Sequence, residues 1–112
     1  LTKDLADKFV KSKNALPETE NFAIESDAMG TNMILNYSTL NTNRITWPTT
    51  PEGEQVDLKA TCFSANLFKE ILVANKEHET GYIEVSSAGL ARVSFTGKDY
   101  SSTYYLVQLQ AN

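Results

Sequence analysis

The side chains with the clearest chemical potential in this sequence are polar groups on two segments that have the spacing of amphipathic helices. A helical projection at about 100° per residue places six of these polar residues away from the apolar faces. They are Lys3, Lys8, Lys11, Asn66, Lys69 and Lys76. Long, mobile ammonium groups can contact phosphates without reading bases, which gives salt-sensitive binding that is independent of sequence. Lysines on the solvent face of a helix can equally serve solubility alone, and Asp4 and Asp7 on the same face favour that alternative.

Groups suited to catalysis or metal binding are few. The sole histidine, His78, lies between Glu77 and Glu79 at an expected helix end, and we predict that it is an exposed turn residue. The sole cysteine, Cys62, lies in an apolar stretch and is predicted to be a buried structural thiol. The sequence has no Cys-x-x-Cys, no His-x-x-x-His and no glycine-rich phosphate loop. We therefore expect no catalytic residue, no metal ion, no cofactor and no enzymatic activity.

The first half of the chain has the pattern of one helix and three strands. Residues 2–15 are predicted to form a helix that Thr2 caps and that ends before Pro17. Phe22 and Ile24 then alternate with polar residues, a turn is expected at 29–32, and the alternation resumes at 33–37. A third strand is predicted over 43–47. It is expected to end there because the prolines and the glycine of 48–53 prevent regular strand pairing.

The second half adds a strand before its helix. Residues 55–63 alternate Val56, Leu58, Ala60 and Cys62, and Ser64 is predicted to cap a helix that ends near 75–80. The projection of this helix buries its apolar residues and exposes Val73 on the polar side. The residues predicted to be buried are Leu67, Phe68, Ile71 and Leu72. Three strands are expected to follow, over 81–85, 90–96 and 102–110.

These elements predict an α+β fold built from two repeats of a helix plus antiparallel strands. Repeat one covers 1–47, a connector covers 48–54, and repeat two covers 55–112. The second repeat matches the first, except that the first repeat has no strand before its helix. A chain of 112 residues is long enough for one hydrophobic core, so we expect a single domain. The first residue is Leu1 rather than Met, and we expect the chain to be a fragment of a longer protein.

The composition limits the classes of function. A formal net charge of −4 argues against a dedicated nucleic-acid binder, although four of the ten basic residues lie within the first fourteen positions. No apolar run approaches the roughly 18 residues of a membrane-spanning helix, and no signal-peptide pattern opens the chain. We expect no membrane partner and a cytoplasmic location.

Four stretches resemble the C-terminal domain of DNA sliding clamps, the processivity factors of DNA polymerases. The closing residues 89–97 and 102–109 are similar to the last strands of clamps from T-even-like bacteriophages and, more distantly, of bacteria. Residues 63–72 are similar to the strand-to-helix entry of that domain, and residues 21–25 to a strand of its first repeat. The tail at 107–110 lacks the Met-Pro-Met ending of bacterial clamps.

The resemblance implies a ring that encircles duplex DNA without sequence specificity and tethers a polymerase and a clamp loader. It would place the six polar residues above on the DNA side, and the phage clamps would put the protein in the host cytoplasm. It also implies a pocket for partner peptides, for which the candidates are Trp47, Pro48, Tyr105 and Val107. Trp47 and the tyrosines could instead complete the core. A different class remains open, in which the chain is a stand-alone protein-interaction or small-ligand-binding module.

Overall fold

The computed structural model of the chain describes residues 2–16, 18–27, 30–35, 45–49, 58–86 and 88–109. The first half of these residues contains α1 (Lys3–Ala15), β1 (Asn21–Asp27), β2 (Gly30–Leu35) and β3 (Ile45–Thr49). The second half contains β4 (Leu58–Ser64), α2 (Ala65–Ala74), β5 (Thr80–Ser86), β6 (Leu90–Thr96) and β7 (Ser101–Val107). The strand pairs of these residues are antiparallel, so the predicted α+β class is confirmed.

Both helices begin at the residues that the sequence predicts. The Thr2 hydroxyl oxygen accepts a hydrogen bond from the Leu5 N–H at 3.1 Å, and the Ser64 hydroxyl oxygen accepts one from the Leu67 N–H at 3.2 Å. A side-chain oxygen at this position satisfies one of the N–H groups that have no partner within the helix. Because Ser64 is also the last residue of β4, strand and helix follow each other without a loop.

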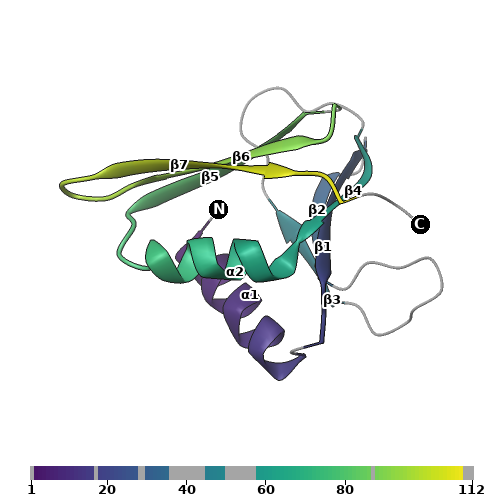
Figure 1. Ribbon diagram of the computed structural model, residues 1–112, viewed down its shortest axis with the longest axis horizontal. Helices are drawn as coiled ribbons and strands as arrows, with labels where there is room; N and C mark the ends of the chain where they lie inside the picture. Colours follow the sequence, from purple (N-terminus) through teal and green to yellow (C-terminus); the bar gives the residue numbers. More distant parts are fainter. Residues whose placement is uncertain are drawn as a thin grey trace.

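The strands form two sheets, with four strands in the order β3-β2-β1-β4 and three in the order β5-β6-β7. Figure 1 shows the three-stranded sheet above the two helices and the four-stranded sheet to one side of them. β4 therefore joins the sheet of β1, β2 and β3, although it lies in the predicted second repeat. It pairs with β1, with Phe63 opposite Phe22 and Ser64 opposite Asn21.

Pro48 lies inside β3, so the predicted end of this strand at Trp47 is wrong. β3 runs from Ile45 to Thr49, with Pro48 opposite Asn32 of β2. Proline is tolerated there because β3 is an edge strand, in which the backbone groups on the outer side need no hydrogen-bond partner in the sheet. The predicted connector accordingly loses its first two residues to β3, and its remainder, 50–54, lies outside the described residues.

A β-bulge in β4 changes which of its side chains face the core. The register moves from Ile24 opposite Thr61 to Ser26 opposite Leu58, so β4 has one residue more than β1 over this interval. As a result Thr61 and Phe63 are buried, and Leu58 also packs against the core. The simple alternation predicted for this strand does not hold, since Cys62 is only partly buried.

The last three strands lie close to their predicted positions. β6 has the predicted bounds, β5 extends by one residue at each end, and β7 begins one residue early and ends at Val107 rather than near 110. Beyond β7, the Leu109 N–H donates to the Cys62 carbonyl oxygen at 2.8 Å. This bond ties the end of the three-stranded sheet to β4 of the other sheet.

One hydrophobic cluster among the described residues draws on both helices and both sheets. Its centre is aromatic: the Phe68 ring of α2 stacks on Phe22 of β1 at 4.6 Å and meets Phe9 of α1 edge to face at 4.8 Å. Such pairs contribute about 0.5–1.5 kcal/mol each beyond the area that they bury. These contacts hold α1 and α2 against each other and against the four-stranded sheet.

Candidate nucleic-acid and partner interfaces

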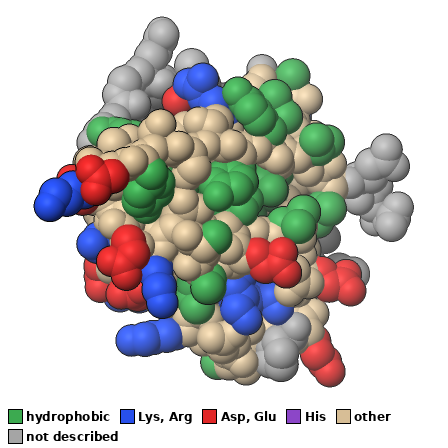
Figure 2. Space-filling model, turned by 60° about the vertical axis from the view of Figure 1, so that its left-hand side comes forward, with side chains coloured by type: hydrophobic (Ala, Val, Ile, Leu, Met, Phe, Trp, Pro, Cys, Tyr) green, Lys and Arg blue, Asp and Glu red, His purple; other side chains and the backbone are tan. Residues whose placement is uncertain are grey.

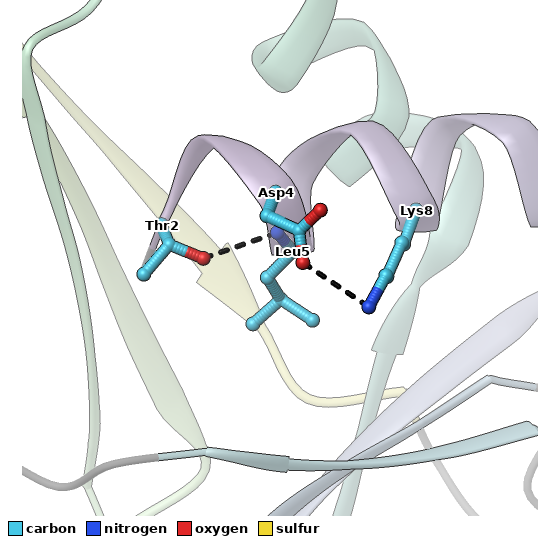
Figure 3. A network of polar contacts seen from close by, with 4 residues as sticks. All are labelled: Thr2, Asp4, Leu5 and Lys8. Atoms are coloured by element: carbon cyan, nitrogen blue, oxygen red, sulfur yellow. Dashed lines mark hydrogen bonds and ion pairs between the residues drawn. The ribbon is translucent and has the colours of Figure 1, made fainter.

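The exposed face of α1 carries the lysines that the sequence predicts there. Lys3, Lys8 and Lys11 are all exposed, as are Asp4 and Asp7. Lys8 Nζ lies 3.1 Å from an Asp4 carboxylate oxygen, one helical turn away, and both side chains remain in solvent (Figure 3). An exposed pair of this kind stabilises the helix by only a few tenths of a kcal/mol. It does, however, partly neutralise Lys8 as a contact for an anion.

Lys13 departs from the other lysines of α1. It is buried, on the same side of the helix as Ala6 and Phe9. The sequence signal for this burial is spacing: Lys13 follows Phe9 by four residues, and residues at this spacing share a helix face. Lys13 is therefore not part of the exposed lysine set.

The face that α2 turns to solvent is less basic than predicted. Asn66 and Lys76 are exposed, but Lys69 is partly buried, and Lys76 lies in the turn beyond the helix end at Ala74. Leu67 was predicted to be buried and is 53% exposed; Ala65, Phe68 and Leu72 form the buried stripe instead. The prediction failed because the packing of Phe68 rotates the helix so that Leu67 points outward.

Charge and apolar surface are therefore interspersed around the helices. Val73 is exposed as predicted, and with Leu67 and Glu70 it makes the outer side of α2 both apolar and acidic. Figure 2 shows hydrophobic side chains grouped in the upper and central part of one face, with charged side chains of both signs below and at its edge. The exposed lysines thus form separate contact points and not a continuous basic surface.

The four residues predicted to line a partner pocket are divided between the two sheets. Trp47 and Pro48 are neighbours on β3 and face opposite sides of the four-stranded sheet. Trp47 is partly buried, with its ring 6.1 Å from that of Phe9, and it packs against the core as the alternative interpretation expected. Pro48 is exposed.

Tyr105 and Val107 lie on the outer face of the three-stranded sheet and are 62% and 74% exposed. The register places Leu90 directly opposite Val107, and Arg92 opposite Tyr105. We call Leu90, Tyr105 and Val107 the outer apolar patch. Sequence reasoning missed Leu90, whose position opposite Val107 depends on the β6–β7 register.

A charged pair borders the outer apolar patch. An Arg92 Nη lies 2.6 Å from a Glu84 carboxylate oxygen, across the β5–β6 pair. The hydrogen bond to Glu84 and its charge, with a smaller contribution from Tyr105, raise the pKa of the Arg92 guanidinium. A row of Glu84, Arg92 and Tyr105 across three strands therefore offers a cation, an anion and an aromatic ring side by side.

His78 is buried, so its predicted place in an exposed turn is wrong. Its Nδ1 lies 2.7 Å from the carbonyl oxygen of Asn75, and its ring packs against Phe95 at 5.0 Å. Gly81 leaves the space for this packing, since a Cβ there would meet both rings. His78 Nε2 has no hydrogen-bond partner among the residues that the structure describes. We assign it a packing role at the end of α2.

Cys62 is only partly buried, in contrast to the buried thiol predicted. Burial still raises the pKa of this thiol, because desolvation disfavours the thiolate. Within the part of the chain that the structure describes, no group of three or more His, Cys, Asp or Glu side chains could hold a metal ion. No helix among the same residues is both long and apolar enough to cross a membrane.

These surfaces together offer scattered lysines on the helices and an outer apolar patch on the three-stranded sheet. Comparison with protein-family models, with curated proteins and with solved structures finds no match for this chain.

Proposed function

We propose that this chain is a domain of a DNA sliding clamp, a processivity factor that encircles duplex DNA and docks replication proteins. The observation that carries the proposal is the duplicated element order with one helix from each repeat. In sequence, α1 is followed by β1, β2 and β3, and α2, which β4 directly precedes, is followed by β5, β6 and β7. The two helices pack together on one side of both sheets (Figure 1). Such a pair suits a surface that faces a duplex.

The contacts with DNA would be few and directed at phosphates. Lys3 and Lys11 of α1 and Lys76 beyond α2 are exposed and can each reach an oxygen of the backbone. Exposed Asn66 can donate a hydrogen bond from its amide. Lys8 already pairs with Asp4, and Lys69 is partly buried, so both lysines would contribute less to the contact with DNA. Weak, sequence-independent contacts suit a protein that moves along DNA.

The outer apolar patch, which contains Tyr105 and Val107 of the predicted pocket, would be a docking surface. Tyr105 and Val107 are exposed, whereas Trp47 packs against the core. Tyrosine and arginine are enriched in binding hot spots, and Arg92 lies opposite Tyr105 in the β6–β7 pair. Polymerase or clamp-loader peptides would be the partners there.

The proposal predicts weak DNA binding that depends on Lys3 and Lys11. We would measure the fluorescence anisotropy of a labelled 30-base-pair duplex over a range of salt concentrations. The variant Lys3→Glu/Lys11→Glu should bind at least about tenfold more weakly at low salt, and its salt slope should fall by roughly two. Lys59→Glu/Lys98→Glu is the matched control, because these exposed lysines lie on β4 and on the β6–β7 turn. Equal losses in both variants would contradict the proposal.

A protein-interaction module is the second candidate, and the outer side of α2 favours it. Leu67 and Val73 are both about half exposed where a DNA-facing helix would be polar. In that case the lysines only keep the helices soluble. Absence of DNA binding at low salt, together with loss of a protein partner on Tyr105→Ala, would favour this module over the clamp.

A further inference from the structure

The outer face of the three-stranded sheet carries little charge. Exposed and more buried residues alternate along β5, β6 and β7, so the exposed side chains share one face of the sheet. Glu84 and Arg92 are the only charged residues in these three strands, and their side chains pair with each other. The outer apolar patch lies beside this pair and includes Val107, which is 74% exposed. This face is therefore neutral overall, whereas the whole chain has a formal net charge of −4.

The neutral face indicates what kind of surface would cover it. Duplex DNA is bound by basic groups that replace its counterions, and the single arginine of this face already pairs with Glu84 at 2.6 Å. A strongly acidic or strongly basic peptide would be repelled by one member of this pair. The covering surface should therefore be apolar, with one charge of each sign beside its apolar part. Each further copy of the chain offers such a surface, namely its own outer face.

We propose that two copies of the chain associate face to face through their outer apolar patches, about a two-fold axis. The strand register defines two neighbouring rows of side chains that run across the sheet. The rows are Glu84, Arg92 and Tyr105, and Ser86, Leu90 and Val107. A two-fold axis in the contact plane, perpendicular to the strands and between the two rows, sets each row against the other row of the second copy. This contact closes with two copies and is distinct from a ring.

This axis brings complementary side chains together. Tyr105 would lie opposite Val107 of the second copy. Arg92 would lie opposite Leu90 of the second copy, which the aliphatic part of the arginine can cover. Glu84 would lie diagonally across from Arg92 of the second copy. An axis along β6 would instead set the two Arg92 side chains against each other, and like charges in an interface repel. Charge therefore favours the axis that crosses the strands.

The size of the face limits the affinity. Each of the three strands has seven residues. Strands lie about 4.8 Å apart and rise about 3.3 Å per residue, so the face covers on the order of a few hundred Å². A standard interface buries about 800 Å² per partner. We therefore expect a weak dimer, with a Kd on the order of 100 µM. A peptide that docks on Tyr105 and Val107 would compete with the second copy for the same patch.

The test is the concentration dependence of the mass in solution. Sedimentation equilibrium is measured at chain concentrations from about 10 µM to about 1 mM, without DNA or any other protein. Val107→Asp places a carboxylate against the Tyr105 ring of the second copy. Its matched control is Tyr82→Asp, which adds the same charge to the same face at a tyrosine that is 45% exposed. Tyr82 lies opposite Ser94, in the row on the far side of Arg92, so the proposed axis leaves it beyond the facing strands of the second copy.

Val107→Asp should weaken the dimer at least about tenfold, with Tyr82→Asp like the parent chain. In Tyr105→Lys/Val107→Asp each new lysine faces a new aspartate, so the dimer should recover to within about threefold of the parent. A parent chain that stays monomeric at about 1 mM would overturn the proposal. So would equal effects of Val107→Asp and Tyr82→Asp, or no recovery in the double variant. None of these outcomes depends on DNA binding, so the clamp proposal is tested separately.

Discussion

Ser102 of β7 donates a hydrogen bond from its hydroxyl to the side-chain oxygen of Asn75 at 2.7 Å, and this bond joins the end of α2 to the three-stranded sheet. The same Asn75 amide donates to the Ile71 carbonyl oxygen at 2.8 Å and to the Tyr104 hydroxyl at 3.1 Å. Asn75 is nearly inaccessible to solvent, so its oxygen and its NH₂ group are both satisfied within the protein. One amide side chain therefore links the end of α2 to two residues of β7.

Asn75→Ala should lower the free energy of unfolding by about 2–3 kcal/mol. The substitution removes three hydrogen bonds and leaves the Ser102 and Tyr104 hydroxyls without these partners. Urea unfolding followed by circular dichroism measures the change. Asn66→Ala, within α2, is the matched control for the loss of an asparagine side chain, and we expect less than about 0.5 kcal/mol there because Asn66 is exposed. Similar values for the two variants would argue against the role of Asn75.

Phe68 and Leu67 are adjacent in sequence and should differ sharply on truncation. Phe68 is completely buried between Phe22 and Phe9, so Phe68→Ala should cost about 3–5 kcal/mol. Leu67 is half exposed, so Leu67→Ala should cost less than about 1 kcal/mol. Thermal and urea unfolding of the two variants measure both. A larger loss for Leu67→Ala would mean that its original assignment to the buried face was correct.

The helices and the β6 strand were predictable because their signals are local. A cap residue followed by helical spacing marks Thr2 and Ser64, and turn residues bound β6. What the sequence does not contain is the position of one element against another. The β-bulge that turns Leu58 inward, the pairing of β4 with β1 and the rotation that exposes Leu67 all result from packing across the chain.

The candidate sites show the same division. The exposure of Lys3, Lys8 and Lys11 follows from the helical period alone. His78 was mispredicted because burial of its ring depends on the space beside Gly81 and on Phe95, which lies on another strand. The separation of Trp47 from Tyr105 depends on which sheet each strand joins, and the sequence pattern does not specify that.

Cys62 should react slowly while the protein is folded. Because burial raises the pKa of its thiol, less thiolate is present at pH 8 than in the unfolded chain. Iodoacetamide labelling followed by mass spectrometry should therefore be slower in buffer than in urea. The linked effect on stability is fully present below the thiol pKa of the unfolded chain, about 8.5, and is lost as the pH rises through the higher pKa of the folded state.

Cys62→Ser provides the control for that pH dependence. The parent chain should lose stability relative to this variant as the pH rises above about 8.5, since only the parent has a thiol to ionise. Urea unfolding of both proteins at pH 7 and pH 10 measures the difference, and the shared tyrosine and lysine titrations cancel. A difference that does not change with pH would contradict the raised pKa.

Asp4→Asn tests whether the α1 face meets phosphates by a gain of binding. The change removes the carboxylate that holds Lys8 Nζ at 3.1 Å and frees this ammonium group for an anion. An electrostatic gain of about 0.5 kcal/mol corresponds to a roughly twofold tighter Kd for duplex DNA at low salt. The free energy of unfolding should fall by less than about 1 kcal/mol, because Asp4 also interacts favourably with the helix N-terminus. Asp99→Asn, in the exposed β6–β7 turn, is the control for the change in net charge. Equal gains for both variants would mean that net charge alone sets the affinity, and that α1 has no special place in DNA binding.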